Sequence, residues 1–184
     1  MVSPLVLHAP PAVGFESPFE MLDACHERVE RTLALLERLS AHLQTQGEPG
    51  PAQSAARDVL RYFDLAAPLH HEDEEQHVFP PLLTGADPVL AALAQALIDE
   101  HRLLAQAWTR VRQDLQACLA PPPLPAFSAA QAQGWADFCA LYRQHLRRED
   151  QVAYPAAQAV LDRPARQHMG REMAARRGQR PPEA

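Results

Sequence analysis

Two segments of the chain place a histidine four residues before a glutamate, and the two segments match. HHEDEEQHVFP begins at His70, and HLRREDQVAYP begins at His145. When these histidines are aligned, Glu74 aligns with Glu149, and the following acid, glutamine, aromatic residue and proline also coincide. Residues four positions apart share one face of an α-helix, so each segment offers an imidazole and a carboxylate that point the same way.

Two further histidines, His26 and His101, complete an internal repeat. The same 44-residue interval separates His26 from His70 and His101 from His145. The chain therefore consists of two similar helical hairpins, each with a lone histidine on its first helix and an HxxxE pair on its second.

The repeat separates these histidines from their neighbours. His71 and His77 align with Leu146 and Val152, so neither has a counterpart in the second hairpin. Polar side chains are mostly exposed. We therefore expect both histidines to lie at the surface or to contact the four repeated histidines from outside. The same expectation holds for the remaining histidines, His8, His42 and His168.

The chemistry that suits this set of residues is a metal centre. Four histidines and two carboxylates exceed the needs of one tetrahedral zinc ion and suit two six-coordinate irons bridged by the carboxylates. Each iron would then keep a position for a bridging oxide or hydroxide and for an outside ligand. The predicted metal ligands are His26, His70, Glu74, His101, His145 and Glu149.

Two other interpretations compete with this site. In the first, these histidines and acids simply lie on solvated helix faces, where charged residues are usually found. That interpretation does not explain the matched spacing. Ferritin-like di-iron bundles place the glutamate three residues before the histidine. Glu74 and His77 have this spacing, but Val152 occupies the equivalent position after Glu149, so the ferritin-like pattern fails in the second hairpin.

Long amphipathic segments joined by Pro- and Gly-rich connections must carry the ligands. Ser17 and Ser128 each precede an acid or amide by three residues, the spacing of a capping box, and Asp87 precedes a proline. Pro68 lies inside the second segment and predicts a kink or register defect. The expected helices run from 18 to the GEPGP breaker at 47–51, from about 53 to 83, from 88 to the PPPLP breaker at 121–125 and from 128 to about 161, with a short fifth helix over 163–177.

These segments predict an all-α protein, an antiparallel up-down four-helix bundle. No run of alternating β-branched residues predicts a strand, and 184 residues are expected to form one domain. The expected organisation is a Pro-rich extension at 1–16, the bundle at 17–162 and a polar, Arg-rich tail at 163–184 that we expect to be solvated.

The overall composition excludes several classes of function. The formal charge is −6 without a basic stripe, which argues against nucleic acid as a partner. Three cysteines without a CxxC pair indicate neither a disulfide framework nor a thiolate zinc site. The sequence shows no signal peptide and no apolar stretch long enough to span a bilayer, so we expect a cytoplasmic protein with no membrane partner.

The histidines and HxxxE pairs, in this order on four helices, resemble those of the hemerythrin-like (HHE cation-binding) proteins. The segments EEQHVFP and HLRREDQVAYP are similar to that family's helix ends, and the resemblance covers roughly residues 17–161. It implies a hemerythrin-like bundle with two iron ions, bridged by an oxide or hydroxide. Such a centre would bind or sense dioxygen, nitric oxide or a related small ligand.

The chain departs from the oxygen-carrying hemerythrins in its ligands. They have a second histidine one turn after that of the third helix, where this chain has Ala105, so we expect one iron to be more open. They also place the fourth-helix carboxylate five residues after its histidine. Glu149 and Asp150 are both available here, and the repeat favours Glu149. Glu30, four residues after His26, is a further carboxylate that this spacing turns toward the site, where it is either a third carboxylate ligand or, the interpretation we favour, an ordinary exposed glutamate.

Three aromatic residues are expected near the site, and two of them, Phe63 and Phe138, either pack against it and exclude water or simply fill the core. Phe63 and Phe138 each lie seven residues before a ligand histidine, and Tyr142 lies three residues before His145. We expect Tyr142 to face inward, where its hydroxyl can donate a hydrogen bond to a bound ligand.

Three functions remain open at this point. The first is binding or sensing of a small diatomic molecule or peroxide, without turnover. The second is a redox enzyme that reduces peroxide or nitric oxide, or an iron donor in repair of iron centres, and either would need a redox partner that the sequence does not identify. Ala105 favours the enzyme, because it frees a coordination position. The third is a redox-silent bundle stabilised by metal.

Overall fold

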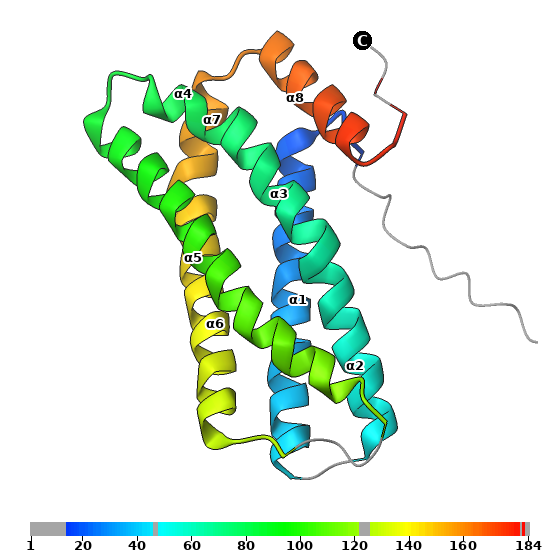
Figure 1. Cartoon of the computed structure of the whole chain (residues 1–184). Coiled ribbons are helices and arrows are strands. Elements are labelled where there is room, and N and C mark those ends of the chain that lie inside the picture. The colour runs from blue at the N-terminus through cyan, green and yellow to red at the C-terminus, as the bar shows by residue number, and fades with distance from the viewer. Residues whose placement is uncertain (1–13, 46–47, 122–125, 181, 183–184) are drawn as a thin grey trace, which may run out of the picture.

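The computed structural model describes residues 14–45, 48–121, 126–180 and 182, and every regular element among them is helical (Figure 1). Within these residues no helix is both long and apolar enough to cross a membrane. The α-helices are α1 (Pro18–Gln44), α2 (Pro49–Arg61), α3 (Ala67–Asp73), α4 (Phe79–Leu83), α5 (Pro88–Cys118), α6 (Ala129–Arg148), α7 (Tyr154–Val160) and α8 (Arg163–Arg176). Three π-helical segments join some of them, namely η1 (Tyr62–Ala66), η2 (Glu74–Val78) and η3 (Glu149–Ala153).

These elements form four long rods and one short helix. The second rod runs from α2 through η1, α3 and η2 to α4, and the fourth runs from α6 through η3 to α7. Rods that follow each other in the chain pack together, and α1 also packs against α6, which closes the ring. The predicted four-helix bundle and the fifth helix are therefore confirmed (Figure 1).

Two of the three expected helix caps form. The Asp87 side chain accepts backbone hydrogen bonds at the start of α5, and Ser128 forms a capping box at the start of α6. The capping box expected at Ser17 is wrong, because its side chain makes no capping bond although α1 starts at the expected residue. The backbone N–H of Ser17 donates instead to the Gly14 carbonyl at 3.2 Å, which directs the chain into the helix.

A proline follows each π-helical segment. Pro68, Pro80 and Pro155 occupy the second position of α3, α4 and α7. Proline has no N–H to donate to the carbonyl four residues earlier, and its ring clashes with that carbonyl. The preceding turn widens into a π-bulge, a feature frequent at functional sites. Pro68 thus accompanies the predicted register defect, and the other two prolines follow segments that begin at Glu74 and Glu149.

The apolar core consists of two clusters with polar residues between them. One cluster fills the end where α1 meets α2 and α5 meets α6, and the other fills the end that contains α4, α7 and α8. On α1, Leu22 belongs to one cluster and Val29 to the other, and His26 lies between them. His101 lies between the two clusters on α5 in the same way, since Leu97 and Leu104 belong to different clusters.

The C-terminal segment is not the solvated tail that we expected from its arginines. Helix α8 lies across one end of the bundle (Figure 1) and buries Met169 and Met173 in the second cluster. The fully buried carboxylate of Asp73, on α3, lies 2.7 Å from Nε of Arg176 and 2.6 Å from a terminal nitrogen of Arg177. Arg176 and Arg177 therefore connect α8 to the second rod, which carries the candidate ligands His70 and Glu74.

Candidate metal centre

All six predicted ligands lie together in the middle of the bundle. Each of them has a relative exposure of 5% or less. Because an isolated buried charge is costly, such a cluster is expected to be paired or to bind metal. The side chains come from all four rods, with His26 on α1, His70 on α3, Glu74 on η2, His101 on α5, His145 on α6 and Glu149 on η3.

Glu74 presents one oxygen to each side of the site. Its Oε1 lies 3.5 Å from Nε2 of His70 and 3.7 Å from Nε2 of His26. Its Oε2 lies 3.5 Å from Nε2 of His101. The carboxylate therefore stands between histidines of the first hairpin and a histidine of the second.

Glu149 repeats this arrangement from the opposite rod. Its Oε2 lies 3.4 Å from Nε2 of His26. Its Oε1 lies 2.9 Å from Nε2 of His145 and 3.7 Å from Nε2 of His101. Both glutamates thus have the placement of a bridge between two metal ions.

Many of these inward-facing atoms have no hydrogen-bond partner among the described residues. A buried polar atom left without a partner costs about 1–3 kcal/mol, and coordination of a metal would satisfy several of them together. Imidazole nitrogens and carboxylate oxygens are ligands for iron, zinc and related ions. The donor set therefore fits a metal centre. The unpartnered atoms are Nε2 of His70, His101 and His145, Oε2 of Glu74 and both carboxylate oxygens of Glu149.

The candidate ligand atoms form two groups, each with its atoms within 4.8 Å of one another. The first half of the site consists of His26, His70, Glu74 and Glu149, and the second half consists of His71, His101 and His145. His71, which we expected at the surface or behind the ligands, is half-buried and belongs to the second half.

Acidic side chains outside the site hold three of the four ligand imidazoles through Nδ1. A carboxylate in this place keeps the proton on Nδ1 and leaves the lone pair of Nε2 for the metal. Two of these acids directly follow a site glutamate in the sequence and reach a histidine of the other hairpin. The pairs are Asp150 with His26 at 2.6 Å, Glu75 with His101 at 2.8 Å, and Glu100 with His145 at 3.0 Å.

The two other carboxylates considered from the sequence lie outside the site. Asp150 is exposed and approaches His26 from its outer side, which leaves Glu149 as the inward-facing acid of its rod. Glu30 is also exposed, and it accepts a hydrogen bond from Arg143 at 3.1 Å. The expectation that Glu30 turns toward the site is therefore wrong, and the favoured alternative, an ordinary exposed glutamate, is confirmed.

Tyr154 reaches into the first half of the site. Its hydroxyl donates to Glu74 Oε1 and lies 2.8 Å from Nε2 of His26. Its counterpart in the first hairpin is Phe79, which packs against His101 with ring centroids 5.6 Å apart. The sequence showed that an aromatic residue recurs at this position, but the hydrogen bond of Tyr154 has no counterpart and was missed.

The three aromatic residues expected near the site form one buried group. The ring of Tyr142 lies 5.4 Å from that of Phe63 and 5.5 Å from that of Phe138, measured between centroids. The Tyr142 hydroxyl bonds Nε2 of His71 at 2.9 Å. Tyr142 faces inward as predicted, and its partner is a side chain of the second half.

The carboxylates determine the protonation of the site when no metal is bound. Burial lowers the pKa of His26, but the neighbouring carboxylates, led by Asp150, outweigh it and raise the pKa to about 12. Burial lowers the pKa of His101 as well. The two site glutamates outweigh this effect and raise that pKa to about 10. Burial raises the pKa of Glu74, yet the histidines around it hold that pKa well below its usual value. Without metal, the site therefore holds protonated imidazoles against ionised carboxylates.

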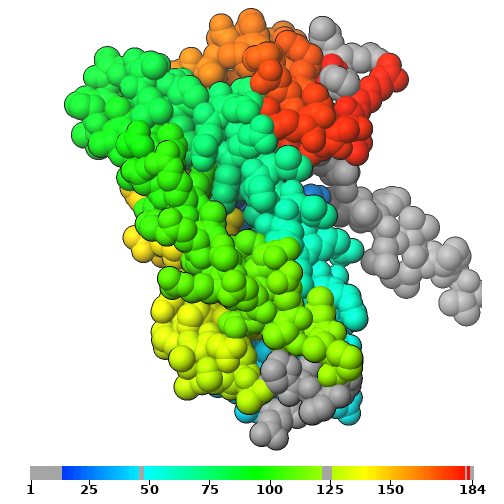
Figure 2. Space-filling model, in the orientation of Figure 1, coloured from blue at the N-terminus to red at the C-terminus, as the bar shows by residue number. Residues whose placement is uncertain are grey.

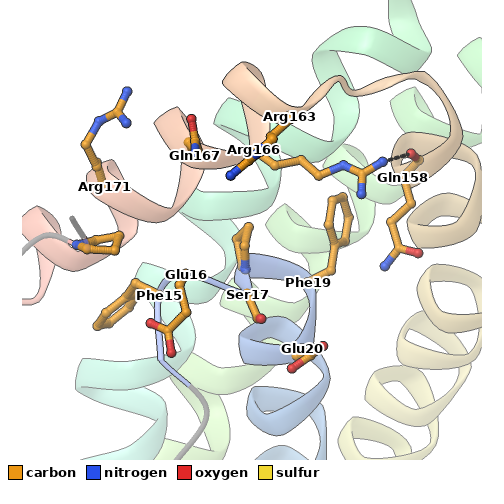
Figure 3. Close-up of a pocket in the computed structure, with 12 residues that line it drawn as sticks. Phe15, Glu16, Ser17, Phe19, Glu20, Gln158, Arg163, Arg166, Gln167 and Arg171 are labelled. Atoms are coloured by element: carbon orange, nitrogen blue, oxygen red, sulfur yellow. Dashed lines mark hydrogen bonds between the residues drawn. The ribbon is translucent and has the colours of Figure 1, made fainter. Parts of the chain in front are cut away.

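Two pockets open at the surface of the described residues, and one of them is lined in part by a candidate ligand. A pocket of 570 Å³ opens between the start of α1 and α8, where Arg163, Arg166 and Phe19 are among its lining residues (Figure 3). None of the described residues that line it is a candidate ligand. A second pocket of 560 Å³ borders His26 and Asp150 from outside the bundle. On the face shown in Figure 2, α5 runs beside the second rod, and α8 covers one end of the bundle.

Comparison with known proteins agrees with this geometry. A protein of Haemophilus influenzae, described as uncharacterized, is 33% identical over 102 residues, which make up 55% of this chain and 59% of that protein. The model of the Hemerythrin HHE cation binding domain matches residues 17–157, a range that contains all six candidate ligands. The chain therefore belongs to the hemerythrin HHE cation-binding family.

Proposed function

We propose that the site binds two iron ions bridged by Glu74 and Glu149, and that this pair binds or senses dioxygen, nitric oxide or a related small ligand. The placement of the two glutamates carries the proposal. Each carboxylate turns one oxygen toward imidazoles of the first half and the other toward imidazoles of the second half. A single tetrahedral ion would use only part of this donor set.

The surrounding residues orient the metal-binding side chains and limit the access of water. Bound ferrous ions would supply electrons and open coordination positions. Asp150, Glu75 and Glu100 keep the Nε2 lone pairs directed inward. Tyr154 donates a hydrogen bond to one bridging carboxylate and so holds its orientation. The buried aromatic group around Tyr142 keeps bulk water away from the second half.

The redox enzyme and the redox-silent bundle are the alternatives. Ala105, one turn after His101, offers no donor atom, which favours reaction with peroxide or nitric oxide at a free position. Sustained turnover would also require an external electron donor. The donor set alone also accommodates zinc, as the redox-silent bundle would require.

Anaerobic reconstitution with ferrous iron, followed by exposure to dioxygen or nitric oxide, tests the proposal. We expect an absorption change that reverses when the gas is removed. Sustained consumption of peroxide or nitric oxide in the presence of a donor would establish the enzyme instead. Bound metal that gives no spectral response to any of these molecules would contradict both and leave the structural role.

A further inference from the structure

A further groove, of 440 Å³, opens between α1 and the second rod, and arginines dominate its lining. Helices α1 and α2 lie side by side here (Figure 1). Every charged residue of the lining except Asp58 is an arginine, although the formal charge of the chain is −6. The groove is therefore a local concentration of positive charge on an acidic protein. Its arginines are Arg28, Arg31 and Arg38 on α1 and Arg61 on α2.

The positive charge of this groove is available to a partner. Among the described residues, the side chains of Arg28 and Arg38 have no ion-pair partner. Arg31 and Arg61 each pair with one acid, at 3.5 Å and 3.1 Å, and the side chains of both pairs are exposed. Exposed pairs contribute at most about 1 kcal/mol. An incoming carboxylate can therefore compete for each of these arginines.

The spacing of the arginines suits an extended anionic surface. Arg28 and Arg38 are ten residues apart on one helix, which separates their Cα atoms by about 15 Å. One small anion can engage only part of this row, whereas several carboxylates on a protein surface can engage all of it. Leu35 and the exposed Leu65 add apolar surface to the same groove.

The groove lies over the first half of the candidate metal site. The Tyr62 side chain lines the groove, and its hydroxyl donates to the carbonyl of Cys25, the residue before His26, at 3.2 Å. Ala66, also in the lining, lies one turn before His70. A protein that docks in the groove therefore approaches two histidines of the first half.

We propose that this groove is the docking surface for a small acidic protein that carries one electron at a time. A small contact in which charges steer association is typical of transient electron-transfer encounters. Two encounters convert two ferric ions into two ferrous ions and oxidise two carriers, which restores the ferrous state that ligand binding needs. This role rests on the two-iron centre proposed above, whereas the docking itself does not.

Docking is tested by titration of the full chain, as purified, with an oxidised acidic ferredoxin of the two-iron, two-sulfur class. At low ionic strength we expect one binding site, and its Kd should rise at least about tenfold in the groove variant Arg28→Gln, Arg38→Gln. The control variant Arg110→Gln, Arg163→Gln removes the same charge from exposed arginines of α5 and α8 and should keep the wild-type Kd. Absence of binding, or an equal Kd in the two variants, would overturn the docking surface.

Electron delivery is tested by mixing the iron-loaded, oxidised chain with the reduced ferredoxin in a stopped-flow instrument. We expect the second-order rate constant of reduction to fall at least about tenfold in the groove variant, and to fall with added salt in the wild type. The methyl viologen radical cation, which arginines do not attract, should reduce both variants equally fast. Ferredoxin that docks without reducing the iron would overturn the electron-carrier role. A chain that binds ferredoxin but fewer than two irons would overturn the two-iron centre and leave the docking surface standing.

Discussion

At the scale of single residues, matched spacing was enough to identify six side chains that the fold brings together. Spacing did not show which partners they meet. Glu75 and Asp150 follow the site glutamates in both hairpins, yet each bonds the lone histidine of the other hairpin. The places of His71 and Tyr154 in the site were not predicted for a related reason. A repeat reveals equivalent residues, and the polar contacts of these two side chains have no equivalent in the other hairpin.

Removing an outer carboxylate should weaken metal binding without removing a ligand. We expect Glu75→Ala to lower the affinity for metal about tenfold, because the His101 imidazole loses the bond that fixes its tautomer and orientation. Competition with a chromophoric chelator measures the affinity. Glu72→Ala is the matched control, because Glu72 is an exposed residue of the same rod, and within the described part of the chain its side chain accepts a hydrogen bond from Gln76 alone, at 3.0 Å. Equal affinities for the two variants would rule out this role for Glu75.

Metal affinity should rise with pH. The pKa of His26 is raised to about 12 and that of His101 to about 10 in the absence of metal, so both imidazoles carry a proton at neutral pH. A metal ion must displace these protons to reach Nε2. Isothermal titration between pH 6 and 8, in buffers of different ionisation enthalpy, should show net proton release and tighter binding at the higher pH, as expected for proton competition. Binding with no proton release would show that the imidazoles are already neutral.

At the scale of helices, periodicity and breakers predicted where the rods lie, and Asp87 and Ser128 marked two of their starts. The register defect before Pro68 was predicted, but the two π-helical segments that begin at the site glutamates were not, because a hydrophobic pattern tolerates one extra residue in a turn. A signal for both was nevertheless present. A proline follows each site glutamate by the same six-residue interval, at Pro80 and Pro155. These prolines force the turn that starts at the glutamate away from regular α-helical geometry.

The ion pairs of Asp73 should hold α8 on the bundle. Its carboxylate is fully buried between Arg176 and Arg177, and removing one partner of a buried pair costs about 3–5 kcal/mol. We expect Asp73→Ala to lower the free energy of unfolding in urea by about 3 kcal/mol. Asp58→Ala breaks an exposed pair with Arg61 and should cost less than about 1 kcal/mol. A similar small loss in both variants would show that α8 is held by its apolar contacts alone.

At the scale of the whole molecule, the bundle separates two apolar clusters by a polar layer that takes at least one side chain from each rod. The sequence predicted the bundle, because four amphipathic faces need one shared core. It did not predict that the C-terminal segment completes this core, since the contacts of Met169 and Met173 depend on how α8 docks. A metal at the centre would link all four rods.

Metal binding should therefore stabilise the fold. A ligand that binds only the native state adds about 2.7 kcal/mol when its free concentration is 100 times its Kd. For a chain of this size that corresponds to a rise in Tm of about 5–10 °C, which calorimetry can follow during loading and chelation. His70→Ala should show a much smaller rise. An equal rise in wild type and variant would mean that metal binds elsewhere.

The most direct measurement is the metal content of the purified chain, determined for iron, manganese and zinc before and after anaerobic reconstitution with ferrous iron. Convergence of imidazoles from four helices on two carboxylates, each facing both halves of the site, predicts two irons per chain. One zinc, or no metal after reconstitution, would contradict the bridged centre, and the proposed binding of small ligands would be withdrawn with it.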